Sequence, residues 1–196
     1  MIEVEKKFIL ENKDLKRLIS EAEFISTNEF TDVYYDDQDY SLTKNDIWLR
    51  SRSDRFELKF PVLSEAAHSF INLYDEIYNE PEMCTKLKIE FRKSLEHSLK
   101  SSGYNPFCSI ITTRTKYKKD NFIIDIDRVD FGYQLAEIEL QVSSEKEVEE
   151  ASNKIINFAK SYGLKIKPIR GKVIEYIRRN NPNHFEALKS AYGINL

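Results

Sequence analysis

The sequence is poor in the residues that build several common kinds of site. Its 196 residues include two cysteines, Cys84 and Cys108, whose spacing fits neither a zinc site nor a disulfide framework. Five glycines are present without a Gly-rich phosphate loop, which excludes P-loop chemistry. No low-complexity linker or internal repeat is visible. These absences favour a single domain from a reducing compartment.

Long apolar runs and a strong excess of charge of one sign are also missing. No apolar segment approaches the length of a membrane span. The formal net charge is −3, from 30 basic and 33 acidic side chains. We therefore expect neither membrane insertion nor binding to nucleic acid. The first predicted strand begins at Ile2, which leaves no room for a signal or transit peptide. We expect a cytoplasmic protein, with a monomer as the default.

Predicted strands and helices come in blocks along the chain. Strand-forming residues bounded by turns predict strands over residues 2–9, 24–36, 47–52, 55–60, 107–118, 122–128 and 133–142. Amphipathic spacing predicts helices over residues 12–23, 64–79, 83–101, 144–162 and 171–180, and a last short helix from residue 182. Runs of strands with segregated helices are typical of an α+β fold.

The first predicted strand has a charged face and an apolar face. Glu3, Glu5 and Lys7 lie on one side at a period of two, and Val4 and Phe8 lie on the other. The same alternation returns in later strands, whose polar faces consist of Trp48, Arg50 and Arg52; Glu57 and Lys59; Thr112, Arg114 and Lys116; Asp125 and Asp127; and Glu137, Glu139 and Gln141.

For any one of these strands, a solvent-facing side is the ordinary interpretation. Two features of the whole set weigh against it. Carboxylates two residues apart on a strand lie about 7 Å from each other, which is unfavourable unless a cation lies between them. Paired arginines can bind phosphate oxygens. If the helices cover the apolar faces, the charged faces line the inside of a barrel, where a chain of phosphates and a hard divalent cation fit.

The residues from Glu3 to Lys7 match the Glu-x-Glu-x-Lys signature of the CYTH superfamily, the triphosphate tunnel metalloenzymes. The chain also resembles the thiamine triphosphatase branch of that superfamily at Tyr34–Asp36, Trp48–Arg52, Glu57–Lys59, Asp125–Asp127, Asp130–Tyr133, Glu137–Glu139 and Lys172–Tyr176. The resemblance implies a single CYTH domain over residues 1–196. Its implied fold is an eight-stranded antiparallel β-barrel that forms a triphosphate tunnel, with helices packed outside.

The resemblance also implies roles for individual residues. The implied ligands of Mg²⁺, or of Mn²⁺, are Glu3, Glu5, Asp127, Glu137 and Glu139. The implied substrate-binding residues are Lys7, Trp48, Arg50, Arg52, Lys59, Arg114 and Lys172. Lys59 and Tyr34 are the implied catalytic pair that helps to activate water. Lys172 rests on the resemblance alone, because a lysine at a helix start is otherwise a solvated residue. Trp48 is either a packed anchor or a ring that stacks on the thiamine cation.

The expected activity is Mg²⁺-dependent hydrolysis of thiamine triphosphate to thiamine diphosphate and phosphate. An inorganic tripolyphosphatase is the first alternative, because Trp48 is the only residue that favours thiamine as part of the substrate. A class IV adenylyl cyclase would need a base pocket that the sequence does not reveal. A non-catalytic triphosphate-binding module is a further alternative, although binding alone would need fewer carboxylates near an anion. The sequence leaves open the choice of metal, the number of metal ions and the oligomeric state.

Overall fold

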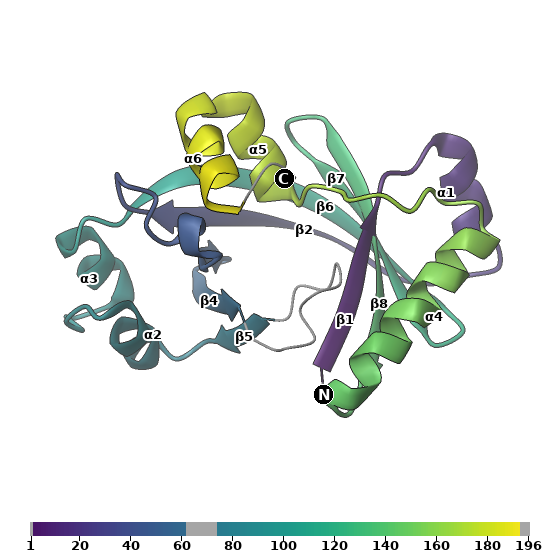
Figure 1. Cartoon of the computed structure of the whole chain (residues 1–196), viewed down its shortest axis with the longest axis horizontal. Coiled ribbons are helices and arrows are strands. Elements are labelled where there is room, and N and C mark those ends of the chain that lie inside the picture. The colour runs from purple at the N-terminus through teal and green to yellow at the C-terminus, as the bar shows by residue number, and fades with distance from the viewer. Residues whose placement is uncertain (1, 62–73, 193–196) are drawn as a thin grey trace. The chain divides into compact units, whose positions relative to one another are not determined.

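The computed structural model describes residues 2–61 and 74–192. Their strands are β1 (Ile2–Phe8), β2 (Glu23–Asp36), β3 (Trp48–Arg52), β4 (Arg55–Pro61), β5 (Tyr74–Ile77), β6 (Asn105–Lys119), β7 (Phe122–Val129) and β8 (Tyr133–Val142). Their helices are α1 (Asn12–Ile19), α2 (Glu80–Leu87), α3 (Leu95–Ser101), α4 (Val148–Ser161), α5 (Lys172–Asn180) and α6 (Pro182–Tyr192), with short 3₁₀ turns η1 (Thr43–Asn45) and η2 (Glu145–Glu147) (Figure 1). The predicted α+β class is confirmed.

The eight strands form one sheet in the order β1-β8-β7-β6-β2-β3-β4-β5. Every strand pair with a described register is antiparallel. The hairpin between β3 and β4 turns at Ser53 and Asp54, whose φ angles of 48° and 62° are both positive. Two positive φ angles at the tip match the right-handed twist of the flanking strands, and this keeps Arg50 opposite Glu57.

The chain divides into two compact units. Within the first unit, helix α4 packs against β1 and β8 (Figure 1). Val4 of β1, Ile138 of β8 and Ile155 of α4 are all buried there. Burying an aliphatic side chain of this size contributes about 1.5–3 kcal/mol to stability. Because side chains alternate along a strand, the charged side of β1 faces away from this apolar contact.

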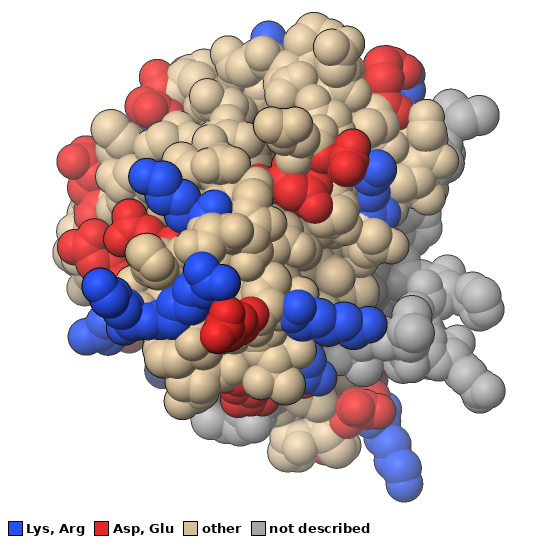
Figure 2. Space-filling view, turned by 90° about the vertical axis from the view of Figure 1, so that its left-hand side faces the viewer, with Lys and Arg blue, Asp and Glu red and all other residues tan. Residues whose placement is uncertain are grey.

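The second unit has its own apolar core, where β3, β4 and β5 meet α2 and α3. The core consists of Leu42, Leu49, Leu58, Ile77, Met83, Cys84, Leu95 and Leu99. Helices α5 and α6 pack against each other, and α6 also contacts η1. On the face shown in Figure 2, basic and acidic side chains both occur among uncharged ones, as the small net charge of the sequence leads one to expect.

Two predicted helices differ from the structure. The predicted helix over residues 64–79 lies in part outside the described residues, and its described part forms the short strand β5, which pairs with β4. The predicted helix over residues 83–101 is divided into α2 and α3. Lys88 ends α2 with a φ of 56°, and its N–H donates to the carbonyl of Cys84. Ser94 then starts α3 by accepting the N–H of His97.

Strand β5 was missed because its four residues are too few to show a period of two, and only the pairing with β4 stabilises the extended conformation. Within the described part of the chain, no helix has the length and apolar character needed to cross a membrane.

Candidate active site

The first unit gathers carboxylates on the charged sides of β1, β7 and β8. Strand register places Glu5 opposite Glu139 and Glu137 opposite Asp125. Two groups of carboxylates have oxygens within 4.8 Å of one another: Glu3, Glu5 and Glu139, and Asp125, Glu137 and Glu139. Glu139 belongs to both groups. Oxygen-only donors at this density fit a hard divalent cation such as Mg²⁺.

Glu139 lies in an environment that disfavours its ionised form. Its side chain is buried, and burial together with the charges of Asp125 and Glu3 raises its pKa to about 8. Lys116, whose ammonium lies 3.8 Å from a carboxylate oxygen of Glu139, opposes this shift without cancelling it. A bound divalent cation would supply the missing positive charge and keep Glu139 ionised at neutral pH.

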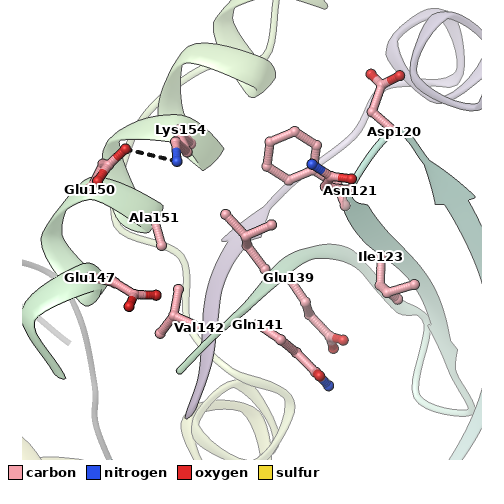
Figure 3. A pocket seen from close by; sticks show the side chains of 12 residues that line it. Asp120, Asn121, Ile123, Glu139, Gln141, Val142, Glu147, Glu150, Ala151 and Lys154 are labelled. Atoms are coloured by element: carbon pink, nitrogen blue, oxygen red, sulfur yellow. Dashed lines mark ion pairs between the residues drawn. The ribbon is translucent and has the colours of Figure 1, made fainter. Parts of the chain in front are cut away.

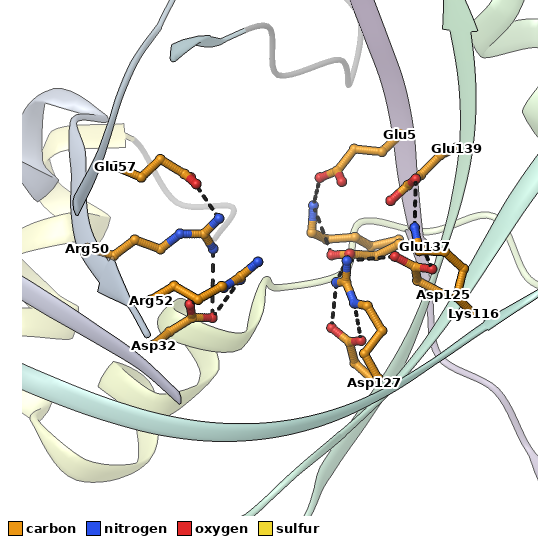
Figure 4. A network of polar contacts seen from close by, with 12 residues as sticks. Glu5, Asp32, Arg50, Arg52, Glu57, Lys116, Asp125, Asp127, Glu137 and Glu139 are labelled. Atoms are coloured by element: carbon orange, nitrogen blue, oxygen red, sulfur yellow. Dashed lines mark hydrogen bonds and ion pairs between the residues drawn. The ribbon is translucent and has the colours of Figure 1, made fainter. Parts of the chain in front are cut away.

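Arg114 lies among the acids of the same unit. It donates from Nε and Nη2 to the two oxygens of Asp127 at 2.7 and 2.8 Å, and from Nη2 to Glu137 at 2.5 Å. Its Nη1 lies 2.6 Å from Asp125. Burial alone would lower the pKa of Arg114, but these carboxylates outweigh burial and hold the guanidinium charged. Arg114 thus pairs with Asp125, Asp127 and Glu137, three acids that Figure 4 labels.

This arrangement bears on the predicted metal ligands. Asp127 directs both carboxylate oxygens at Arg114 and belongs to neither of the two groups of converging carboxylates. Asp125, which lies outside the predicted ligand set, belongs to one of them. The Asp-x-Asp spacing was the signal for both residues, and strand register distinguishes them: Asp127 lies opposite Arg114 of β6, whereas Asp125 lies opposite Glu137 of β8. The assignment of Asp127 to the metal stays a prediction.

Lys7 lies on β1 beside the same acids. Its ammonium forms ion pairs with Glu5 and, at 3.6 Å, with Glu137. Burial would lower the pKa of Lys7, but the two carboxylates outweigh burial and raise it. Lys7 therefore carries a positive charge at the place where β1 approaches β8.

The second unit contains a network in which arginines alternate with acids. Arg52 donates from Nε and Nη2 to the two oxygens of Asp32 at 2.7 and 2.9 Å. Arg50 pairs with Glu57 at 2.7 Å and approaches Asp32 at 3.7 Å. Asp32 is fully buried; burial would raise its pKa, but hydrogen bonding to Arg52 and the charges of both arginines lower it. Arg50 and Arg52 are thus fixed side by side (Figure 4).

The predicted catalytic pair also lies in this unit. Lys59 forms ion pairs with Glu76 and, at 3.5 Å, with Glu57. Tyr34 on β2 is paired in register with Arg50 and is buried. Burial raises the pKa of Tyr34 to about 12, so its phenol keeps the proton at neutral pH.

Trp48 is held by its polar edge. Its Nε1 donates to Oδ1 of Asp46 at 2.8 Å, and the hydroxyl of Tyr74 donates to the same oxygen at 2.8 Å. Its ring meets Tyr34 edge-on, with centroids 6.4 Å apart. Both Asp46 and Asp32 were missed as site residues, because a single acid on a strand or in a turn gives no spacing signal.

Lys172 is the first residue of α5 and is only 9% exposed. The alternative interpretation of a solvated lysine at a helix start is therefore wrong. A buried ammonium needs contacts that compensate for its lost hydration.

A pocket of about 830 Å³ opens in the first unit between the β7–β8 strands and α4. Its lining includes Glu139 and Gln141 of β8, and the ion pair of Glu150 with Lys154 borders it on α4 (Figure 3). Of the carboxylates that converge in this unit, Glu139 is the member that lines this pocket.

Comparison with known proteins supports the sequence resemblance. Residues 1–167 match the CYTH domain. The chain is 29% identical to human thiamine-triphosphatase over 208 aligned positions that cover 96% of this chain and 89% of the human protein. Thiamine-triphosphatase of Macaca fascicularis is 30% identical with the same coverage. A solved structure of a protein from Pyrococcus horikoshii matches with a TM-score of 0.62 and 20% identity, covering 90% of this chain and 99% of that one.

Proposed function

This chain belongs to the CYTH domain family, and on that basis we propose that it is a metal-dependent triphosphatase whose preferred substrate is thiamine triphosphate. The similarity to curated thiamine-triphosphatases over most of the chain supports this substrate. The observation that carries the proposal is the convergence of Glu3, Glu5 and Glu139, which have carboxylate oxygens within 4.8 Å of one another. The positive charge near buried Glu139 is too small to prevent the rise in its pKa.

Each side chain has a part in this proposed reaction. Glu3, Glu5 and Glu139 would hold Mg²⁺ or Mn²⁺, which neutralises charge on the phosphate oxygens when bound. Arg50, Arg52, Lys59 and Lys172, together with Lys7 and Arg114, would bind phosphate oxygens. A water molecule forms the new P–O bond to the γ-phosphorus while the bond to the bridging oxygen breaks, and thiamine diphosphate leaves.

Tyr34 would orient the attacking water. With a pKa of about 12 it cannot serve as a base near neutral pH, so its contribution is a hydrogen bond that positions the water or a phosphate oxygen. Lys59, which forms ion pairs with two carboxylates, would supply positive charge near the negative charge that develops on the leaving diphosphate.

Phosphate release from thiamine triphosphate, tripolyphosphate and ATP at matched low concentrations tests this proposal. With Mg²⁺ or Mn²⁺ present, we expect the highest kcat/KM for thiamine triphosphate. A higher kcat/KM for tripolyphosphate would overturn the proposed substrate. Cyclic AMP formed from ATP would indicate a cyclase, and tight binding without product would indicate a binding module. Glu3→Gln and Glu139→Gln should abolish turnover, and near-normal activity in either variant would refute the metal assignment.

An inorganic tripolyphosphatase is the second candidate. It is favoured by the number of cationic side chains, all of which are proposed to bind phosphate oxygens and none of which is proposed to contact an organic group. Trp48 distinguishes the two candidates. Trp48→Leu should lower kcat/KM for thiamine triphosphate about tenfold, and lower it much less for tripolyphosphate, if the indole stacks on the thiamine cation. Equal losses for both substrates would indicate that Trp48 is a packing residue.

A further inference from the structure

Two cationic side chains from distant parts of the chain approach the same aromatic ring. The guanidinium carbon of Arg52 lies 4.0 Å from the ring centroid of Phe30, and the ammonium of Lys172 lies 5.3 Å from it. Phe30 is on β2, Arg52 is on β3, and Lys172 begins α5. All three residues belong to the second unit. Both distances are within the range at which a ring face attracts a cation.

Lys172 is in an unfavourable position for an ordinary lysine. It is nine-tenths buried, and an ammonium loses much of its hydration there. It is also the first residue of α5, where the partial positive charge of the helix N-terminus repels a cation. The ring of Phe30, 5.3 Å from the ammonium, and the negative charge of Asp32 attract the cation and act in the opposite direction.

Arg52 is held on two sides. The buried carboxylate of Asp32 accepts two of its five N–H donors in a bidentate pair, and the guanidinium carbon lies over the ring of Phe30, 4.0 Å from its centroid. A guanidinium fixed in plane and in rotation keeps the remaining donors of the fork in a defined direction. Phe30 and Asp32 therefore act together on Arg52. Both also attract the ammonium of Lys172.

We infer that Phe30 is a positioning residue for phosphate binding, because its ring fixes Arg52 and Lys172 in one arrangement that receives phosphate oxygens. This inference rests on the proposed function, which assigns both cations to the phosphate chain. An aromatic face is required for this role. Leucine at position 30 would fill a similar volume without attracting a cation, whereas tyrosine would keep the face.

Calorimetric binding of tripolyphosphate in EDTA tests the inference without turnover. Phe30→Leu should weaken binding about tenfold, and Phe30→Tyr should stay within about twofold of the wild type. Phe185→Leu is the matched control, because Phe185 on α6 also lies near a lysine, with 5.9 Å between its ring centroid and the ammonium of Lys189. This control should bind like the wild type. Equal binding by Phe30→Leu and the wild type, or equal weakening in Phe30→Leu and Phe30→Tyr, would overturn the inference.

A second measurement separates positioning from a general structural role. In an Arg52→Gln background, Phe30→Leu should weaken binding by less than about threefold, because one of the two cations that the ring holds is gone. A full tenfold loss in that background would show that Phe30 acts independently of Arg52 and would overturn the inference. Absence of hydrolysis by the wild type would overturn the proposed function but would leave this binding comparison valid.

Discussion

At the scale of single residues, the charged side chains differ in whether their charge is balanced. Asp32 has two arginines near it, and its pKa is lowered in spite of complete burial. Glu139 has more acids than bases around it, and its pKa is raised. The two residues have similar burial, so the difference comes from the neighbouring charges.

The raised pKa of Glu139 predicts how the stability of the metal-free protein depends on pH. The folded state holds the proton up to about pH 8, whereas an unfolded chain releases it near the usual value of 4.5. Stability from this group is therefore complete below about pH 4.5 and is lost as pH rises to about 8. In EDTA, the Tm of Glu139→Gln minus the Tm of the wild type should therefore increase by on the order of 5 °C as the pH is raised from about 5 to about 8.5.

Thermal unfolding at both pH values measures this difference. Glu150→Gln is the control, because Glu150 is exposed on α4 and pairs only with Lys154 at 2.8 Å in the described contacts. A Tm difference between Glu139→Gln and the wild type that stays constant with pH would contradict the raised pKa.

At the scale of elements, α6 is attached to η1 through a buried polar chain. Thr43 donates its hydroxyl proton to Asp36 at 2.7 Å, and its oxygen lies 2.7 Å from Nε2 of His184. Because the threonine has given its only proton to the carboxylate, the imidazole must donate through Nε2. Tyr40 stacks on the same imidazole, with ring centroids 3.9 Å apart. The contact thus joins the end of β2 to the start of α6.

Removing the hydroxyl of Thr43 should therefore destabilise the protein. Thr43→Val keeps the side-chain volume but leaves Asp36 and His184 each without this buried partner, which costs about 1–3 kcal/mol. Chemical denaturation measures the free energy of unfolding. Thr85→Val is the control, since the hydroxyl of Thr85 donates to the carbonyl of Pro81 on the exposed side of α2. Equal stability of the two variants would show that the buried chain does not contribute.

Helix α5 contains a buried carboxylate that is paired with two arginines of the same helix. Glu175 is buried and accepts hydrogen bonds from Arg178 and Arg179, and these bonds lower its pKa to about 2. A lowered pKa stabilises the folded state above the usual value of 4.5, and this contribution is lost as pH falls toward about 2. Both arginines are more than one-third exposed, so solvent weakens the interaction.

Glu175→Gln should lower the free energy of unfolding by about 1 kcal/mol near neutral pH. The deficit should shrink as pH falls from about 4.5 toward about 2, because in this range the carboxylate of the unfolded wild-type chain binds a proton that the folded chain does not. Urea denaturation at neutral and acidic pH measures the deficit. A deficit that is the same at both pH values would show that packing rather than charge is responsible.

At the scale of the whole molecule, ligand binding should increase the stability of the folded chain. Any ligand that binds only the folded chain stabilises it, by about 2.7 kcal/mol at a hundredfold excess over Kd. Mg²⁺ with tripolyphosphate should therefore raise Tm by on the order of 5–10 °C for a chain of this length, and EDTA should reverse the metal part of the increase. Differential scanning fluorimetry measures the shift. In Glu3→Gln the metal part should be lost, and an unchanged metal increment in that variant would contradict the assigned ligand group.

The sequence predicted the parts of this protein that depend on local alternation. Period-two patterns located seven of the strands and placed Glu3, Glu5 and Lys7 on one face, because the side-chain direction along a strand depends only on position. The pairs Arg50 and Arg52, and Glu137 and Glu139, were found for the same reason. Strand β5 was missed because its extended form depends on pairing with β4.

Only the tertiary structure decided which charges neutralise one another. Strand register places Asp127 opposite Arg114 and Asp125 opposite Glu137, although the two acids belong to the same Asp-x-Asp pattern in the sequence. Neither Asp32 nor Phe30 belongs to a motif, and each acts through residues that are far away along the chain. Residue types and their alternation set the chemistry that this chain can offer, and the pairing of distant segments determines which side chains supply it, because Coulomb and cation–π interactions depend on distance in space.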